Sequence, residues 1–89
     1  MNKKDKEIFD RIFAHPIVMN IEWNEVEHLF KSLGAEIENT HHSHIKVTLG
    51  SHSHSFIKPH HKEISNKQEI IDIRHFLESA GYNNGENKV

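Results

Sequence analysis

The feature that most constrains the fold of this 89-residue chain is a change in the spacing of its apolar residues. Between Gly34 and Pro59, apolar and polar side chains alternate, which is typical of strands that are buried on one face. The alternating apolar residues of the first two predicted strands are Ala35, Ile37, Ile45, Val47 and Leu49. A third strand is predicted from about Ser53 to Lys58 after a Gly50-Ser51 turn, with Phe56 facing inward and Ile57 outward.

Outside this segment the apolar residues have helical spacing, and three helices are predicted. The first runs from Lys4 to Ala14 and ends before Pro16, because the residue before a proline avoids the helical region. The second has Asn24 as its N-cap and ends at Gly34. The third opens at Ser65 and ends at Gly81. The apolar stripes are Ile8, Phe9, Ile12 and Phe13; Val26, Leu29, Phe30 and Leu33; and Ile70, Ile73, Leu77 and Ala80.

The resulting order, α-α-β-β-β-α, predicts an α+β fold whose helices cover one face of a three-stranded antiparallel sheet and leave the other face in water. We expect an N-terminal helix and linker over residues 1–20, the main domain over residues 21–82 and a disordered tail over residues 83–89. Cysteine is absent, which excludes a disulfide scaffold and fits a reducing cytoplasm. No apolar run approaches the roughly 20 residues that a membrane span requires.

The charges and histidines are unevenly distributed along the chain. Residues 39–62 contain three lysines, no carboxylate and seven of the ten histidines. A segment of this composition can receive an anion such as phosphate. It is also compatible with a solvated polar hairpin that simply lacks acidic residues.

The residues of this segment suggest a histidine-based site for RNA cleavage. One imidazole can take the proton of the 2′-hydroxyl, a second group can protonate the leaving oxygen, and a lysine can stabilise the phosphorane. His44 with Lys46, and His60, are the candidates for these roles, and this mechanism needs no metal.

Two His-x-His pairs, His42/His44 and His52/His54, raise the alternative of a zinc or nickel site. No carboxylate lies in the same segment to complete it, so no metal or other cofactor is expected. His15, His28 and His75 are interpreted as incidental linker or surface residues. Trp23 is interpreted as a core residue rather than a platform for stacking a base.

Several stretches together resemble the HicA family of toxins from bacterial toxin–antitoxin pairs. Residues 21–35 read IEWNEVEHLFKSLGA and are followed by Ser43-His44, a Lys58-Pro59-His60 turn and a helix that ends FLESAG at Gly81. The resemblance covers about residues 21–82 and depends on the whole pattern rather than on any single motif. Where the family has Gly-Ser-His-His, this chain has His42-Ser43-His44-Ile45, so the glycine and the second histidine are absent.

This resemblance implies a double-stranded-RNA-binding-domain-like α-β-β-β-α fold and an mRNA interferase that is restrained by a HicB-type antitoxin protein. His44 takes the family's catalytic position, His60 matches its proline-histidine turn, and RNA contacts are expected from Lys46, Lys58, Lys62 and His42. The expected location is the cytoplasm, with no membrane partner. The alternatives are a non-catalytic module of the same fold that binds RNA or a protein partner, and a histidine-rich metal-binding protein.

Overall fold

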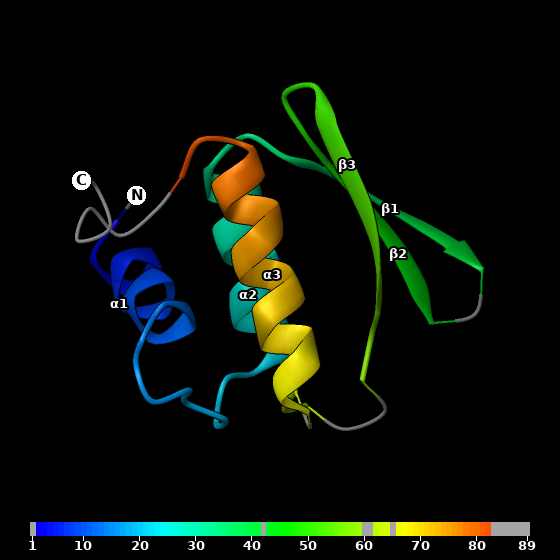
Figure 1. Ribbon diagram of the computed structural model, residues 1–89. Coiled ribbons are helices and arrows are strands. Elements are labelled where there is room, and N and C mark those ends of the chain that lie inside the picture. Colours follow the sequence, from blue (N-terminus) through cyan, green and yellow to red (C-terminus); the bar gives the residue numbers. More distant parts are fainter. Residues whose placement is uncertain (1, 42, 60–61, 65, 83–89) are drawn as a thin grey trace.

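A computed structural model describes residues 2–41, 43–59, 62–64 and 66–82 of the chain (Figure 1). The described residues form three helices and a three-stranded antiparallel sheet, so the predicted α+β class and element order are confirmed. The elements are α1 (Lys3–Ile12), α2 (Trp23–Ser32), β1 (Glu36–His41), β2 (His44–Leu49), β3 (His52–Ile57) and α3 (Lys67–Ser79).

The sheet has the order β1-β2-β3, and its inner face follows the predicted alternation. Ile37 is paired with Val47, and Ile45 is paired with Phe56. The buried side chains of this face are Ile45, Val47, Leu49 and Phe56. Phe56 therefore faces inward as predicted, whereas Ile57 is 54% exposed on the opposite face.

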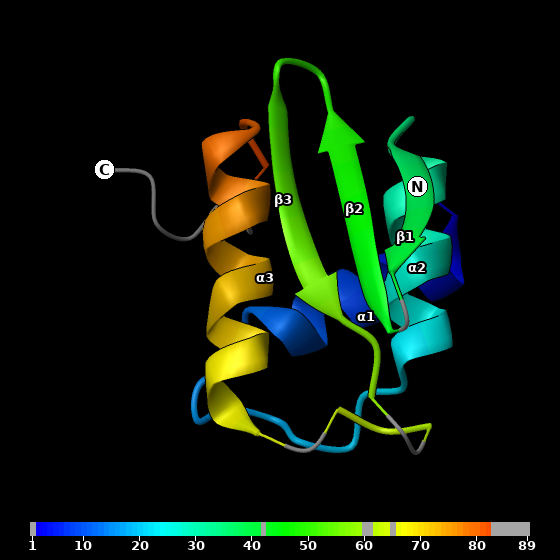
Figure 2. The same ribbon diagram turned by 90° about the vertical axis from the view of Figure 1, so that its right-hand side faces the viewer.

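The helices lie on one side of the sheet and form two layers (Figures 1 and 2). Helices α2 and α3 pack against the sheet, and α1 packs on α2 and α3 on the side away from it. The apolar face of α1 belongs to the same hydrophobic core as the sheet. The Arg74 side chain of α3 connects α3 to the end of α1. Its guanidinium group donates hydrogen bonds to the carbonyl oxygens of Ile12, at 2.5 Å, and Ala14, at 2.6 Å.

The start of α2 differs from its prediction. Glu22, not Asn24, is the N-cap, and the backbone N–H of Glu22 donates to the Glu25 side chain at 3.1 Å. The physical reason is that Trp23 continues the apolar stripe toward the N-terminus: it is 1% exposed and lies on the same face as Val26. This confirms Trp23 as a core residue.

The other helix ends lie close to the predicted positions. Helix α3 is capped by Asn66, whose side chain accepts from the backbone N–H of Glu69 at 2.9 Å, and Ser65 lies outside the described residues. Gly34 and Gly81 follow α2 and α3 with positive φ values of 94° and 96°, a conformation in which glycine carries little steric cost. Residues 83–89 lie outside the described residues. Among the described helices, none has the length and apolar character that crossing a membrane requires.

Candidate functional site

His44 is the first residue of β2, the middle strand of the sheet. Ile45 and Val47 of the same strand face the core, so the side chains of His44 and Lys46 project from the opposite, open face. Both residues are exposed. The alternation of β2 therefore brings an imidazole and an ammonium group to one solvent-facing surface, as predicted.

The neighbouring strands add side chains of different character to this surface. Lys46 is paired with Glu38 of β1 on one side and with Ser55 of β3 on the other. His44 is paired with the exposed Ile57 of β3. Residues opposite each other in adjacent strands share a face, so Lys46 lies beside a carboxylate and His44 lies beside an apolar side chain.

The segment that follows β3 begins next to His44. The backbone N–H of Lys58 donates to the carbonyl oxygen of Ser43 at 2.8 Å, so the exposed Lys58 lies at the edge of the open face. The predicted site residues His42 and His60 lie outside the described residues.

Lys62 lies near the helical layers rather than on the open face. Its carbonyl oxygen accepts a hydrogen bond from the backbone N–H of Trp23 at 2.9 Å. Two residues later, the backbone N–H of Ile64 donates to the carbonyl oxygen of Ile21, also at 2.9 Å. Figures 1 and 2 show the start of α2, the start of α3 and the end of β3 at the same end of the molecule. The structure thus brings His44 and Lys46 together on one face, with Lys58 at its edge and Lys62 beside the start of α2.

The electrostatic environment of this face is more mixed than residues 39–62 suggest. That segment contains no carboxylate, but β1 places Glu36 opposite Thr48 and Glu38 opposite Lys46. The composition of residues 39–62 alone does not reveal these carboxylates, because antiparallel pairing brings in acidic residues that precede the segment. The described part of the face therefore combines one imidazole and one lysine with two carboxylates along β1.

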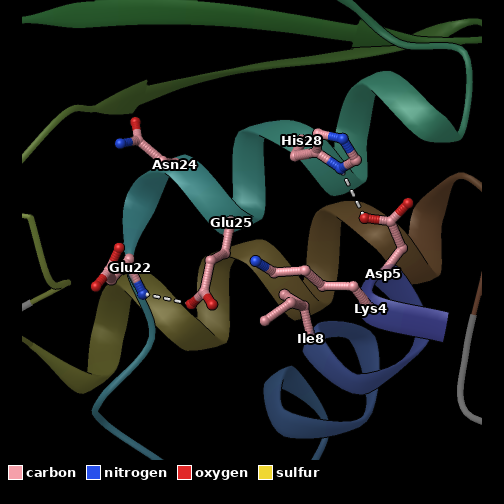
Figure 3. Close-up of a pocket in the computed structure, with 7 residues that line it drawn as sticks. All are labelled: Lys4, Asp5, Ile8, Glu22, Asn24, Glu25 and His28. Carbon is pink, nitrogen blue, oxygen red and sulfur yellow. Dashed lines mark hydrogen bonds and ion pairs between the residues drawn. The ribbon is translucent and has the colours of Figure 1, made fainter. Parts of the chain in front are cut away.

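A second polar site lies between α1 and α2, in a pocket of about 280 Å³ (Figure 3). The Asp5 carboxylate is buried there, with Oδ1 2.8 Å from His28 Nδ1 and Oδ2 accepting from the Ser32 hydroxyl at 2.5 Å. The Asp5–His28 pair and the Glu22–Glu25 hydrogen bond lie at opposite ends of the pocket, with the Lys4 side chain between them (Figure 3).

The pKa of Asp5 is lowered from its ordinary value, first by the Ser32 hydrogen bond and then by the hydrogen bond and charge of His28, against the opposing effect of burial. The carboxylate form is therefore favoured, and it orients the His28 imidazole. The prediction that His28 is an exposed helix residue is confirmed, because its side chain is 63% exposed. Its hydrogen bond to a buried carboxylate was not predicted, and this contact gives His28 a specific structural partner.

A sequence signal for this cluster does exist. Asp5 occupies the position that precedes Ile8, Phe9 and Ile12 at helical spacing, so it extends the apolar stripe of α1. A carboxylate at such a position requires partners when it is buried. His28 and Ser32, spaced i and i+4 on α2, supply them.

No protein-family model, curated protein or solved structure matches this chain. Within the described ranges, no three His, Asp or Glu side chains form a group that could hold a metal ion.

Proposed function

We propose that this protein is an RNA-cleaving toxin of the HicA kind, which cuts mRNA in the cytoplasm and is restrained by a HicB-type antitoxin protein. The observation that carries this proposal is the exposed His44 beside Lys46 on the open face of the sheet. The α-β-β-β-α order of residues 23–79, with this histidine on the second strand, is the order that the resemblance implies.

The proposed reaction is a transesterification within the RNA. The His44 imidazole takes the proton of a 2′-hydroxyl, whose oxygen then bonds to the adjacent phosphorus. The bond from phosphorus to the 5′-oxygen of the next nucleotide breaks, and a second acid, assigned to His60, protonates that oxygen. The products are a 2′,3′-cyclic phosphate and a 5′-hydroxyl end.

The lysines have an electrostatic role in this proposal. Lys46 stabilises the additional negative charge on the phosphorane. Lys58 and His42 contact neighbouring phosphates and position the RNA strand. Lys62, beside the start of α2, contacts a phosphate farther from the point of cleavage. Glu38, opposite Lys46, offsets part of the positive charge, so binding is expected to be weak unless histidines are protonated.

A non-catalytic module that binds RNA or a protein partner is the second candidate. It is favoured by the carboxylate beside Lys46 and by the exposed Ile57 beside His44, which together make a mixed binding surface. Such a module would bind RNA without releasing a cyclic phosphate.

The deciding experiment is induced expression in bacteria of the wild type, His44→Ala and the control His15→Ala. His15 is exposed in the segment after α1, so its replacement should leave the fold intact. We expect growth arrest and mRNA loss with the wild type and with His15→Ala, and neither with His44→Ala. Arrest by His44→Ala as strong as that by the wild type would contradict the assigned role.

Purified protein provides the chemical test. We expect cleavage of single-stranded RNA to continue in EDTA and to produce 2′,3′-cyclic phosphate ends, which can be identified by mass spectrometry. RNA binding in a mobility-shift assay without any cleavage would instead support the binding module.

A further inference from the structure

A groove of about 210 Å³ lies between β3 and α3 and does not include His44. It contains three imidazoles, two hydroxyl groups, a carboxylate and the edge of an aromatic ring. The lining residues are His52, Ser53, His54, Asp72, His75, Phe76 and Ser79. The groove thus combines polar groups with a surface on which a flat ring can stack.

His54 lines this groove from the β3 side. It is paired with the buried Val47, so its side chain is on the inner face of the sheet. It nevertheless remains exposed, because β3 is an edge strand and the β2–β3 hairpin extends beyond the end of α3 (Figure 2). Its ring lies 4.6 Å from that of Phe56 and 6.3 Å from that of Phe76. An exposed imidazole supported by two buried aromatic rings is suited to stacking against a planar ligand.

The rim of the groove offers hydrogen-bonding groups for the edge of such a ligand. Asp72 is half-buried on α3, and its Oδ1 accepts from the Gln68 amide at 3.0 Å. A carboxylate has about four acceptor positions, so Asp72 retains capacity for the amino group of a base. His75 and Ser53 are exposed at the same rim.

The groove lies across the β3 edge from the proposed cleavage site, because His54 is on the inner face of the sheet and His44 is on the open face. Ile57, the partner of His44, is three residues from His54 along β3, which corresponds to about 10 Å. A single strand that crosses the β3 edge can have a phosphate at His44 and a base in the groove, with the change of face and the step from β2 to β3 added to this distance.

We propose that this groove receives one unpaired base of the RNA, on the same strand as the point of cleavage. His54 is the stacking platform and Asp72 accepts a hydrogen bond from the Watson–Crick edge of the base, which is how proteins commonly read single-stranded RNA. This inference rests on the proposed function and adds to it a subsite that determines base preference.

The test uses the full chain with His44→Ala as background, so that binding is measured without cleavage. The affinity for short single-stranded RNAs that differ at one base is measured by fluorescence anisotropy. Base stacking contributes about 1–3 kcal/mol, so we expect His54→Ala to weaken binding roughly 5- to 150-fold. We expect His54→Phe to restore binding, because it restores a planar ring. Asp72→Asn should change the preferred base more than the overall affinity, and the control His15→Ala should change neither.

Thermal melting without RNA shows whether each variant is folded, and His54→Phe keeps the test informative if His54→Ala is not. Unchanged affinity and unchanged base preference in His54→Ala and Asp72→Asn, with RNA still bound, would overturn the groove inference and leave the proposed cleavage intact. Equal loss of binding in His54→Ala and His54→Phe would also count against stacking. If the protein with native His44 cleaves no RNA but the groove variants alter binding as expected, the cleavage proposal fails while the base-binding groove stands. If that protein neither binds nor cleaves RNA, both proposals are wrong.

Discussion

Two exposed histidines of this protein differ in what they contact. The side chain of His28 is 63% exposed on α2, but its Nδ1 lies 2.8 Å from a carboxylate of α1 that is itself buried. His44 lies on the open face of the sheet, and no side-chain hydrogen bond to its imidazole is found among the described residues. The first imidazole is held by its surroundings, and the second is free to contact a ligand.

A carboxylate partner is compatible with either a catalytic or a structural histidine. An Asp–His pair can orient a general base, but Asp5 is also bonded to Ser32 and lies where α1 meets α2. The pair therefore links two helices, and we expect it to contribute mainly to stability. His44 lacks such a link and has Lys46 on the same face, an arrangement that suits chemistry on a phosphate.

The largest expected effect is a separation of activity between the two histidines. His44→Ala should lower the rate of RNA cleavage by about 10²- to 10⁴-fold, the usual contribution of a general acid or base. His28→Ala should leave the rate nearly unchanged, because His28 lies on the helical side of the molecule and not on the open face. Initial rates on a labelled RNA measure both. A comparable loss of cleavage rate in His28→Ala would contradict the functional distinction between the two histidines.

The second expected effect is on stability, for which the Asp5–His28 pair should matter more than His44. Asp5→Ala removes two hydrogen bonds to a buried carboxylate, from Ser32 and His28, so the free energy of unfolding should fall by about 1–3 kcal/mol. His44→Ala removes an exposed side chain and should change it by no more than about 0.5 kcal/mol. Urea denaturation followed by tryptophan fluorescence suits this test, because Trp23 is buried. Equal stability of the two variants would contradict the structural role of Asp5.

A third prediction concerns the pH dependence of stability. The pKa of Asp5 is lower in the folded protein than its ordinary value of 3.8, so the folded state favours the carboxylate. Its contribution is present above about pH 4 and is lost as the pH falls through the lowered folded-state pKa. The stability difference between the wild type and Asp5→Asn should therefore shrink below pH 4. Urea midpoints between pH 3 and pH 7 measure it, and a difference independent of pH would show that Asp5 acts by packing alone.

Much of the fold follows from the sequence because local patterns and burial agree. The alternation of Ile45, Val47 and Leu49 fixes which face of β2 is buried, and it places His44 outward without any knowledge of the other strands. The N-cap of α2 was missed because Asn24 is a good capping residue locally, whereas burial of Trp23 requires the helix to start earlier. Tertiary packing outweighed local propensity at that position.

The surroundings of the candidate sites were less predictable, because they depend on residues far apart in the chain. Glu38 meets Lys46 only through the register of β1 and β2. Asp5 meets His28 across 23 residues, through the packing of α1 on α2. The groove likewise needs α3 to lie along β3, which brings Asp72 to His54. Residue spacing within a single segment cannot predict these contacts.

The smallest expected effect concerns two carboxylates, Glu69 and Asp5, whose pKa values are shifted in opposite directions. Burial and the nearby Asp72 raise the pKa of Glu69, and its Oε1 is buried with no hydrogen-bond partner among the described residues. Because the folded state disfavours this carboxylate, its ionisation above the raised pKa reduces stability, whereas ionisation of Asp5 increases it.

Glu69→Gln removes the charge and keeps the backbone N–H that binds Asn66. It should therefore stabilise the fold at pH 7 by up to about 0.5 kcal/mol, with the gain disappearing in acid where Glu69 is protonated. Urea midpoints at pH 7 and pH 4 measure this, with the exposed Glu78→Gln as the matched control on the same helix. A loss of stability in Glu69→Gln alone at pH 7 would show that the carboxylate has a favourable partner, with His54 the nearest candidate because its charge opposes the upward shift.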